Sequence, residues 1–248
     1  MVTKRRENIS SGAIMDRPVG WILVLMMASL LSSCAPPIYL PNPEQVPFFS
    51  QQGEAQLGAS TGTNTFSVNL GASFERSTAV IANTNYHSST DDTSQIRHQR
   101  YSEFGVGYYW AGDQTARFEI YAGAGIGSVD GRKDIGFSEP DIVEFEGKYR
   151  RYFIQADGGT VMAEGQLEAG PVVRLAYVDF YEYSEHRGAV PRIPTKPLSS
   201  FFFEPGVMAR LGSSHFRIEV QGGISTPQKD VQFDWELFFG YVGFKVVI

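Results

Sequence analysis

The sequence predicts an all-β fold, an antiparallel up-and-down β-barrel of about ten strands, with eight strands as the smaller possibility. In residues 65–74 and 116–128, apolar and polar side chains alternate, as in strands with one apolar and one polar face. No helical stripe of useful length follows residue 34. The expected strands are 54–61, 65–74, 78–86, 101–110, 116–128, 148–157, 161–180, 201–211, 215–224 and 233–247.

The connections alternate in length, which also predicts a barrel. Short turns are expected at 75–77, 111–115, 158–160 and 212–214, and long polar loops at 87–100, 130–147 and 181–200. Strict alternation places all short turns at one end, as in outer-membrane barrels with short periplasmic turns. Both ends of the barrel chain then fall on the short-turn side. A tether to the periplasmic leaflet fits this geometry, and a lipid on the cell surface is the alternative.

Residues 1–33 are predicted to be a lipoprotein signal peptide. A basic start at residues 4–6 precedes the apolar run 21–31, which is too short to span a bilayer comfortably as a helix. Leu31-Ser32-Ser33-Cys34 has the order of a lipobox, so we expect lipidation of Cys34 and a stable lipid anchor. Because Cys34 is the only cysteine, the mature chain is expected to lack disulfide bonds.

Residues 34–52 are predicted to form a proline-rich tether, and residues 53–248 the barrel. Proline at this density blocks both helix and β-ladder, so the tether should be extended. The same segment holds Tyr39, Phe48 and Phe49. These apolar residues predict that part of it packs on the barrel or on the membrane surface, and a disordered spacer is the alternative.

The polar faces of the strands predict a lumen lined by paired charges. The basic residues on the strands are mostly arginine, which is favoured where charges pair in a confined space. The expected lumen-lining residues are Arg117 with Glu119, Glu168 with Arg174, Glu204 with Arg210, and Arg217 with Glu219. The apolar faces would then contact lipid, the reverse of a soluble barrel. Aromatic girdles are expected from Trp110, Tyr177, Phe180, Tyr181, Phe201, Phe202, Phe203 and Trp235.

The last strand carries an assembly signal and an irregular pattern. Tyr241-x-Gly243-x-x-Val246-x-Ile248 resembles the C-terminal signal read by the barrel-assembly machinery, although it ends in Ile rather than an aromatic residue. Its apolar face switches from Trp235, Leu237, Phe239 and Tyr241 to Phe244, Val246 and Ile248. This switch predicts a β-bulge near Gly240 or Gly243.

Several short strings point to a family. They are Tyr39-Leu40-Pro41-Asn42, Val46-Pro47-Phe48-Phe49, Gly53-Glu54, Tyr152-Phe153-Ile154-Gln155 and Phe203-Glu204-Pro205. Together they resemble lipidated outer-membrane β-barrel proteins of the Bacteroidetes type, over most of residues 34–248. The resemblance implies a barrel in the outer membrane of a Gram-negative bacterium and no particular activity.

The expected function is a non-enzymatic structural or partner-binding component with outward-facing long loops. No catalytic site, metal site or cofactor is predicted. A lumen of paired charges disfavours a wide pore, and a narrow or gated channel stays open as an alternative. The expected partners are outer-membrane lipids and the barrel-assembly and lipoprotein-processing machinery, and the net charge of −6 disfavours nucleic acid.

Two alternatives remain open at this point. The first is a soluble, lipocalin-like periplasmic lipoprotein whose apolar strand faces, with Phe66, Phe118 and Ile218, line a ligand cavity. The second is a hydrolase at the barrel rim, in which His98 and Asp92 activate water.

Overall fold

The computed structural model describes residues 38–75, 77–91, 95–112, 115–134, 141–162, 166–188, 190–191 and 193–248. The predicted signal peptide and Cys34 therefore lie outside the described residues. Within the described ranges, no helix is long and apolar enough to span a membrane.

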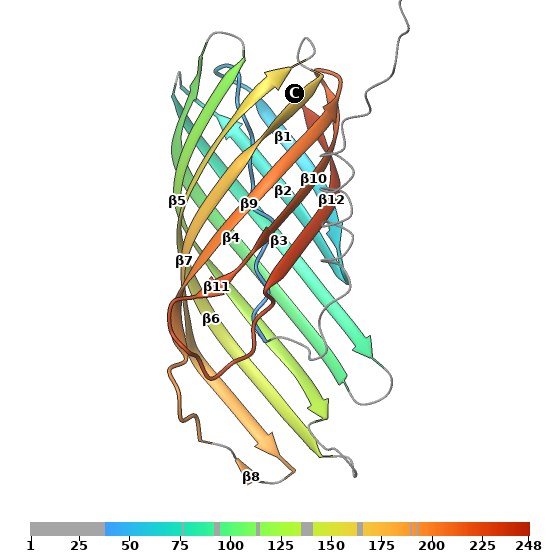
Figure 1. The fold of residues 1–248 in the computed structure, drawn as a ribbon, viewed down its shortest axis with the longest axis vertical. Helices are drawn as coiled ribbons and strands as arrows, with labels where there is room; N and C mark the ends of the chain where they lie inside the picture. The colour runs from blue at the N-terminus through green and yellow to red at the C-terminus, as the bar shows by residue number, and fades with distance from the viewer. Residues whose placement is uncertain are drawn as a thin grey trace, which may run out of the picture.

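Ten long strands form a closed antiparallel barrel (Figure 1). The sheet closes because β1 pairs with both β2 and β12, and β7 pairs with both β6 and β9. The ten-stranded all-β fold predicted from the alternation is thereby confirmed. The long strands are β1 (Ala55–Gly62), β2 (Thr65–Ser73), β3 (Thr78–Asp91), β4 (Gln95–Ala111), β5 (Ala116–Asp134), β6 (Ile142–Met162), β7 (Leu167–Arg187), β9 (Ser199–Gly212), β10 (Phe216–Ile224) and β12 (Phe238–Val247), with short β8 (Val190–Pro191) and β11 (Thr226–Pro227) beside them.

One end of the barrel carries the turns that follow β2, β4, β6 and β9, and we call it the short-turn end. Both ends of the barrel chain lie there, as expected: the Ala55 amide donates to the Ile248 carbonyl at 3.0 Å. Figure 1 shows the C-terminus at this end and the hairpins β3–β4 and β5–β6 closing at the opposite end.

The predicted loops are largely hairpins of paired strand. β3 and β4 pair from Thr78 to Asp91, so most of the expected loop 87–100 is ladder. The expected loops 130–147 and 181–200 shrink to 135–141 and 188–198, apart from β8. These parts of the strands carry polar residues on their outer face, and for that reason the sequence predicted loops there.

The predicted turn at 158–160 is also wrong. These residues lie inside β6, where Gly158 and Gly159 pair with Phe118 and Arg117. A Cβ added to Gly159 would come within 2.5 Å of the ring of Phe48. Gly159 therefore marks a close approach of Phe48 to the barrel wall from inside, rather than a turn.

The predicted bulge in the last strand does not form. β12 pairs with β1 and β10 without a register shift. Phe239 and Tyr241 are buried in the lumen, whereas Val242 and Phe244 are exposed outside. The apparent switch arises because the lumen accepts aromatic residues as well as polar ones. A register shift lies instead between β6 and β7, where Tyr181 is the extra residue beside Lys148/Tyr149.

The barrel is apolar outside and polar inside. Phe66 and Ile218 are each 54% exposed on the outer surface, whereas the side chains of Arg174 and Glu204 are at most 1% exposed. The lipocalin-like alternative requires the opposite arrangement and is excluded. A lipid phase is the solvent that suits such an exterior.

The apolar exterior is a band of defined height. On β6 the outward side chains from Tyr152 to Met162 are apolar or small, over eleven residues. Tilted transmembrane strands have about this length, for a band about 25 Å tall. Beyond Tyr152 the outward residues become charged: Arg150, Lys148, Glu146 and Glu144. The edge of the band therefore lies between Tyr152 and Arg150.

Part of the wall continues past this edge. β5, β6 and β7 have 19 to 21 residues, whereas β1, β2, β10 and β12 have 8 to 10. The ten residues from Ile142 to Arg151 project roughly 25 Å beyond the band at the usual rise and tilt of a barrel strand. We call the parts of β3–β7 beyond the band the extension. Figure 1 shows it on one side of the barrel only.

Candidate functional site

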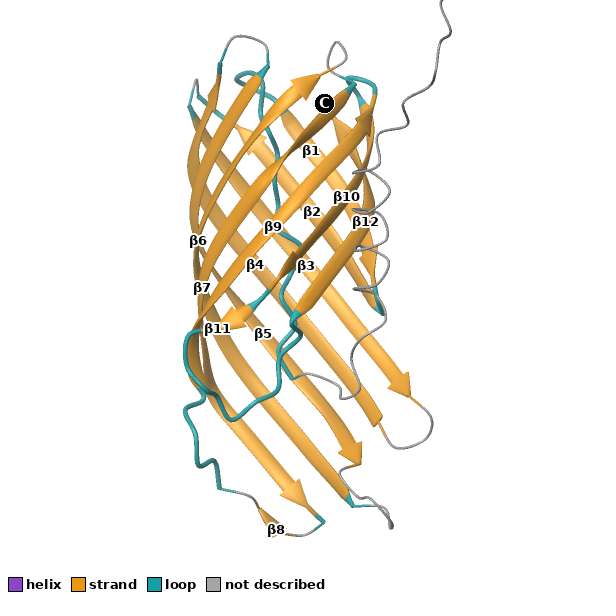
Figure 2. Ribbon diagram, viewed as in Figure 1, coloured by secondary structure: helices purple, strands orange, loops and turns teal. Residues whose placement is uncertain are grey.

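Residues 38–52, which we call the lumen segment, run through the inside of the barrel (Figure 2). The side chains of Ile38, Tyr39 and Phe49 are at most 1% exposed. Part of the tether was expected to pack on the barrel or on the membrane surface, and residues 38–49 do pack against the barrel, on the inner side of its wall. The lumen buries these apolar side chains.

Prolines make the segment a set of hydrogen-bond acceptors. Pro41, Pro43 and Pro47 lack an N–H, so the segment cannot form a β-ladder, and its carbonyls need donors from elsewhere. Side chains of the inner wall provide them. Tyr241 donates to the Pro41 carbonyl (2.8 Å), Asn83 to Pro43 (3.2 Å), Gln155 to Gln45 (2.7 Å), Lys245 to Val46 (3.0 Å), and both Gln56 (3.0 Å) and Arg210 (2.7 Å) to Pro47.

One group of charges, the mouth cluster, holds the segment near the short-turn end. It consists of Glu168, Arg210, Arg217, Glu219 and Lys245. Arg210 pairs with Glu168 (3.2 Å) and Glu219 (2.7 Å), and it also donates to the Val46 carbonyl. Arg217 pairs with Glu168 at 2.5 Å, and Lys245 with Glu219 at 3.3 Å.

Phe48 adopts an unusual backbone conformation beside the mouth cluster. Its φ angle is +54°, which bulky residues rarely adopt. The flanking groups fix this conformation: Arg210 binds the carbonyls of Val46 and Pro47, and the Phe49 amide donates to Glu119 at 2.7 Å. The segment is thus held in one specific path rather than loosely enclosed.

A second group, the edge cluster, lies level with the edge of the apolar band. It consists of Glu103, Arg151, Arg174 and Glu204. Arg151 pairs with Glu204 and, at 3.5 Å, with Glu103, which also lies 3.4 Å from Arg174. The Tyr39 hydroxyl donates to Glu204 at 2.9 Å. The lumen segment therefore shares this cluster of two cations and two carboxylates.

A glycine makes room for the edge cluster. Gly125 stands between Glu103 and Arg151 in the register of β4, β5 and β6. An added Cβ there would lie 2.3 Å from the Tyr101 hydroxyl, which donates to Glu103 at 2.9 Å. The structure therefore gives Gly125 the role of relieving crowding in the lumen.

The structure places the eight residues predicted to line the lumen on the inner face. Glu119, Glu168, Arg174, Glu204 and Arg210 are buried, and Arg117, Arg217 and Glu219 are partly exposed toward the short-turn end. The ion pairs differ from those expected, because they join different strands, several of them not adjacent in the sheet, rather than residues of a single strand.

Sequence reasoning missed half of the site. Glu103, Arg151 and Lys245 were not among the expected residues, nor were the neutral donors Asn83 and Gln155. Each lies on the inward face of a strand, so the strict alternation was the available signal. The lumen segment gives no such periodic signal.

Several predicted girdle residues belong to the interior. Phe180, Phe202 and Trp235 pack in the core with Tyr39 and Phe233. Phe180 continues the alternation of β7, in which Arg174, Ala176 and Val178 also face inward. Trp110, Tyr181, Phe201 and Phe203 are exposed on the outside, as expected for a girdle.

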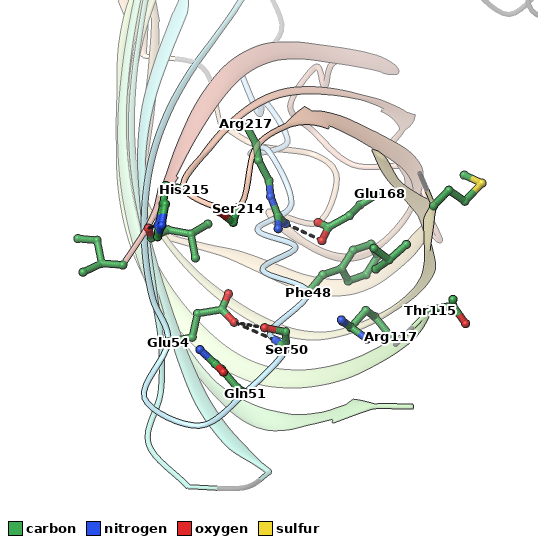
Figure 3. Close-up of a pocket in the computed structure, with 14 residues that line it drawn as sticks. Phe48, Ser50, Gln51, Glu54, Thr115, Arg117, Glu168, Ser214, His215 and Arg217 are labelled. Atoms are coloured by element: carbon green, nitrogen blue, oxygen red, sulfur yellow. Dashed lines mark hydrogen bonds and ion pairs between the residues drawn. The ribbon is translucent and has the colours of Figure 1, made fainter. Parts of the chain in front are cut away.

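A cavity of about 880 Å³ opens at the short-turn end (Figure 3). Its lining includes Arg117, Glu168, Arg217 and His215, and Phe48 of the lumen segment lies within it. Figure 3 shows the Arg217–Glu168 pair and the Ser50–Glu54 hydrogen bonds around it. The cavity is a vestibule that ends on the lumen segment.

The four histidines do not come together in one group. His87 faces the lumen, 2.9 Å from Thr65, whereas His98 lies on the outer face, 3.1 Å from Ser88. Asp92 lies outside the described residues. No group of three metal-ligating side chains occurs within the described ranges.

These features define an outer-membrane β-barrel: a closed antiparallel barrel with an apolar band and a polar, filled lumen. Comparison with solved structures agrees on the fold. The translocator domain of the autotransporter NalP from Neisseria meningitidis superposes with a TM-score of 0.50 at 10% identity, covering 79% of this chain and 85% of that chain.

Two further solved structures are less similar. The outer-membrane protease OmpT from Escherichia coli has a TM-score of 0.46 at 7% identity, covering 80% of this chain and 94% of that chain. The KdgM porin has a TM-score of 0.37 at 10% identity, with coverages of 78% and 98%. No protein-family model and no curated sequence matches the chain. At these identities the likeness concerns the fold and not the activity.

Proposed function

We propose that this protein is a closed, lipid-anchored outer-membrane barrel with a non-enzymatic role, which binds a partner through its extension. The observation that carries the proposal is the lumen segment. It fills the barrel and is hydrogen-bonded along most of its length, so the lumen offers no open path. The extension is then the largest wall surface that neither lipid nor the lumen segment covers.

The charges on the outer face suit an extension that leaves the membrane at the cell surface. Arg100, Lys148 and Arg150 face outward just beyond the band, and the guanidinium of Arg150 lies 4.7 Å from the centre of the Tyr181 ring. Basic and aromatic side chains at this level suit anionic headgroups. Short turns are periplasmic in outer-membrane barrels, which directs the extension outward. Lipidation of Cys34, the residue predicted to carry the anchor, belongs to the same proposal.

A groove of about 420 Å³ on the extension is the proposed partner site. Asp130, Glu144 and Glu146 supply carboxylates there, beside His98 and His186, and Arg132 stands opposite Glu144. In the register, Glu146 stands opposite Asp130. Like charges placed side by side favour a partner that brings cationic or hydrogen-donating groups. The specific partner is therefore expected to present a basic surface.

A photoreactive amino acid in the groove tests the partner-binding role. Placed at Glu146 and irradiated in intact cells, it is expected to give one discrete protein adduct, which is lost when Asp130→Asn and Glu144→Gln are added. The same amino acid at Ile120, on the lipid face, is the matched control and should give no protein adduct. An adduct from Ile120 alone, or none from either Glu146 or the neighbouring Ser184, would contradict the proposal.

A rim hydrolase is the second candidate, because Ser88 Oγ and His98 Nδ1 are 3.1 Å apart and His98 stands opposite Asp130. The pair lies in a paired ladder, whose backbone N–H groups bond to neighbouring strands. They are therefore not available to stabilise an oxyanion. Hydrolysis of a lipid or peptide that disappears in Ser88→Ala would favour this candidate over the partner-binding role.

A further inference from the structure

We infer that the lipid on Cys34 lies in the leaflet on the side of the extension, which is the outer leaflet of the outer membrane. The inference deepens the proposed function. It rests on two parts of that proposal, the lipidation of Cys34 and the outward direction of the extension. The new element is the path of the lumen segment, which carries the N-terminal side of the chain from one end of the barrel to the other.

The C-terminal end of the segment lies at the short-turn end. The Ser50 amide and hydroxyl donate to Glu54 at 2.9 and 2.8 Å, just before β1 begins at Ala55. Phe48 lies in the vestibule at the same end. Followed backward from β1, the chain therefore enters the lumen at the short-turn mouth.

The other end of the segment lies at the opposite edge of the apolar band. The amides of Ile38 and Tyr39 donate to the Asp234 carbonyl at 2.7 and 3.0 Å, in the loop before β12. The Tyr39 ring lies 6.2 Å from the Tyr149 ring and 5.9 Å from the guanidinium carbon of Arg151.

These contacts fix the height of Tyr39 against the membrane. Tyr149 and Arg151 flank Arg150, which is the first charged outward residue beyond the band on β6. Tyr39 is therefore level with the edge of the band. Figure 1 shows the start of the described chain, in blue, near the height at which β1 ends and β12 begins. These are short strands, so the barrel wall ends there without an extension.

Chain length then decides the leaflet. Cys34 precedes Ile38 by four residues, which span at most about 14 Å when fully extended. The opposite face of the apolar band is about 25 Å away. A lipid on Cys34 can therefore enter the leaflet beside the extension and cannot reach the one at the short-turn end. The tether to the periplasmic leaflet expected from the positions of the barrel ends is replaced by an anchor at the cell surface.

Thiol labelling of intact cells tests this inference. Cys34 is the only cysteine, and its sulfur is blocked when lipidated, so Pro37→Cys introduces a single reactive thiol next to the lipid. Lys196→Cys, in the exposed loop before β9, reports the side of the extension, and Ser214→Cys reports the short-turn end. A membrane-impermeant maleimide is added before and after lysis, and mass spectrometry of the N-terminal peptide reads the acyl groups.

We expect Pro37→Cys and Lys196→Cys to be labelled on intact cells, Ser214→Cys only after lysis, and the parent protein not at all. The inference is overturned if Pro37→Cys reacts only after lysis while Lys196→Cys reacts on intact cells and the peptide is acylated. A peptide without acyl groups overturns the lipid anchor itself. Labelling of Ser214→Cys alone on intact cells overturns the proposed orientation and, with it, the assignment to the outer leaflet.

Discussion

Replacing Arg151 by Met is expected to lower the free energy of unfolding by about 3–5 kcal/mol, because it leaves a buried carboxylate without its cation. The side chains of Arg151 and Glu204 are each 1% exposed, and Glu204 keeps only the Tyr39 and Ser225 hydroxyls as partners after the change. Urea unfolding of the folded protein in detergent or lipid measures the loss.

Two variants control this prediction. Arg151→Met combined with Glu204→Gln restores neutrality and should recover most of the stability, since the amide oxygen still accepts from Tyr39. Arg187→Met breaks an exposed pair with Asp141 and should lower the free energy of unfolding by less than about 1 kcal/mol. If Arg151→Met proves as mild as Arg187→Met, the edge cluster does not hold the lumen segment as described.

The change Ile120→Arg is expected to destabilise the protein by about 2–4 kcal/mol and to impair insertion, because it places a charge at the midplane of the bilayer. Ile120 is exposed on the outer face and pairs with Ala156, which lies near the middle of the stretch Tyr152–Met162. Recovery of folded protein in isolated outer membranes and urea unfolding in liposomes measure the effect.

Glu146→Arg is the matched control for position. It also introduces an outward arginine on the barrel wall, but beyond the band, where water solvates the charge. We expect full insertion and a change in the free energy of unfolding below about 1 kcal/mol. Equal effects of the two substitutions would show that the band does not mark the membrane.

The sequence predicted the strands best where one face meets lipid. Between Phe118 and Ile126 strict alternation indicates both the strand and its inward side, and Glu119 was found in this way. Pairing was not predictable, because Glu103 reaches Arg151 across β5, and the register depends on the whole sheet.

The lumen segment escaped prediction for a different reason. Prolines give an extended path without a period, so Tyr39 and Phe48 indicate burial but not the surface that buries them. Most of the extension was missed because charged residues such as Glu144 and Glu146 look like a loop unless the buried residues beside them, such as Val143 and Phe145, are recognised. Phe180 was placed on the wrong side because it was taken for a girdle residue near a strand end, although the alternation of β7 turns it inward together with Arg174 and Val178.

Fluorescence quenching by brominated lipids tests the central claim, an apolar exterior in lipid around a filled lumen. Outside the predicted signal peptide the chain holds two tryptophans: Trp110, half exposed on the outer face, and Trp235, packed against the core that includes Tyr39. The variants Trp235→Phe and Trp110→Phe isolate each of them. The structure predicts strong quenching of Trp110 by lipids brominated near the headgroup and little quenching of Trp235. Strong quenching of Trp235, with Trp110 reached only by an aqueous quencher, would contradict this account.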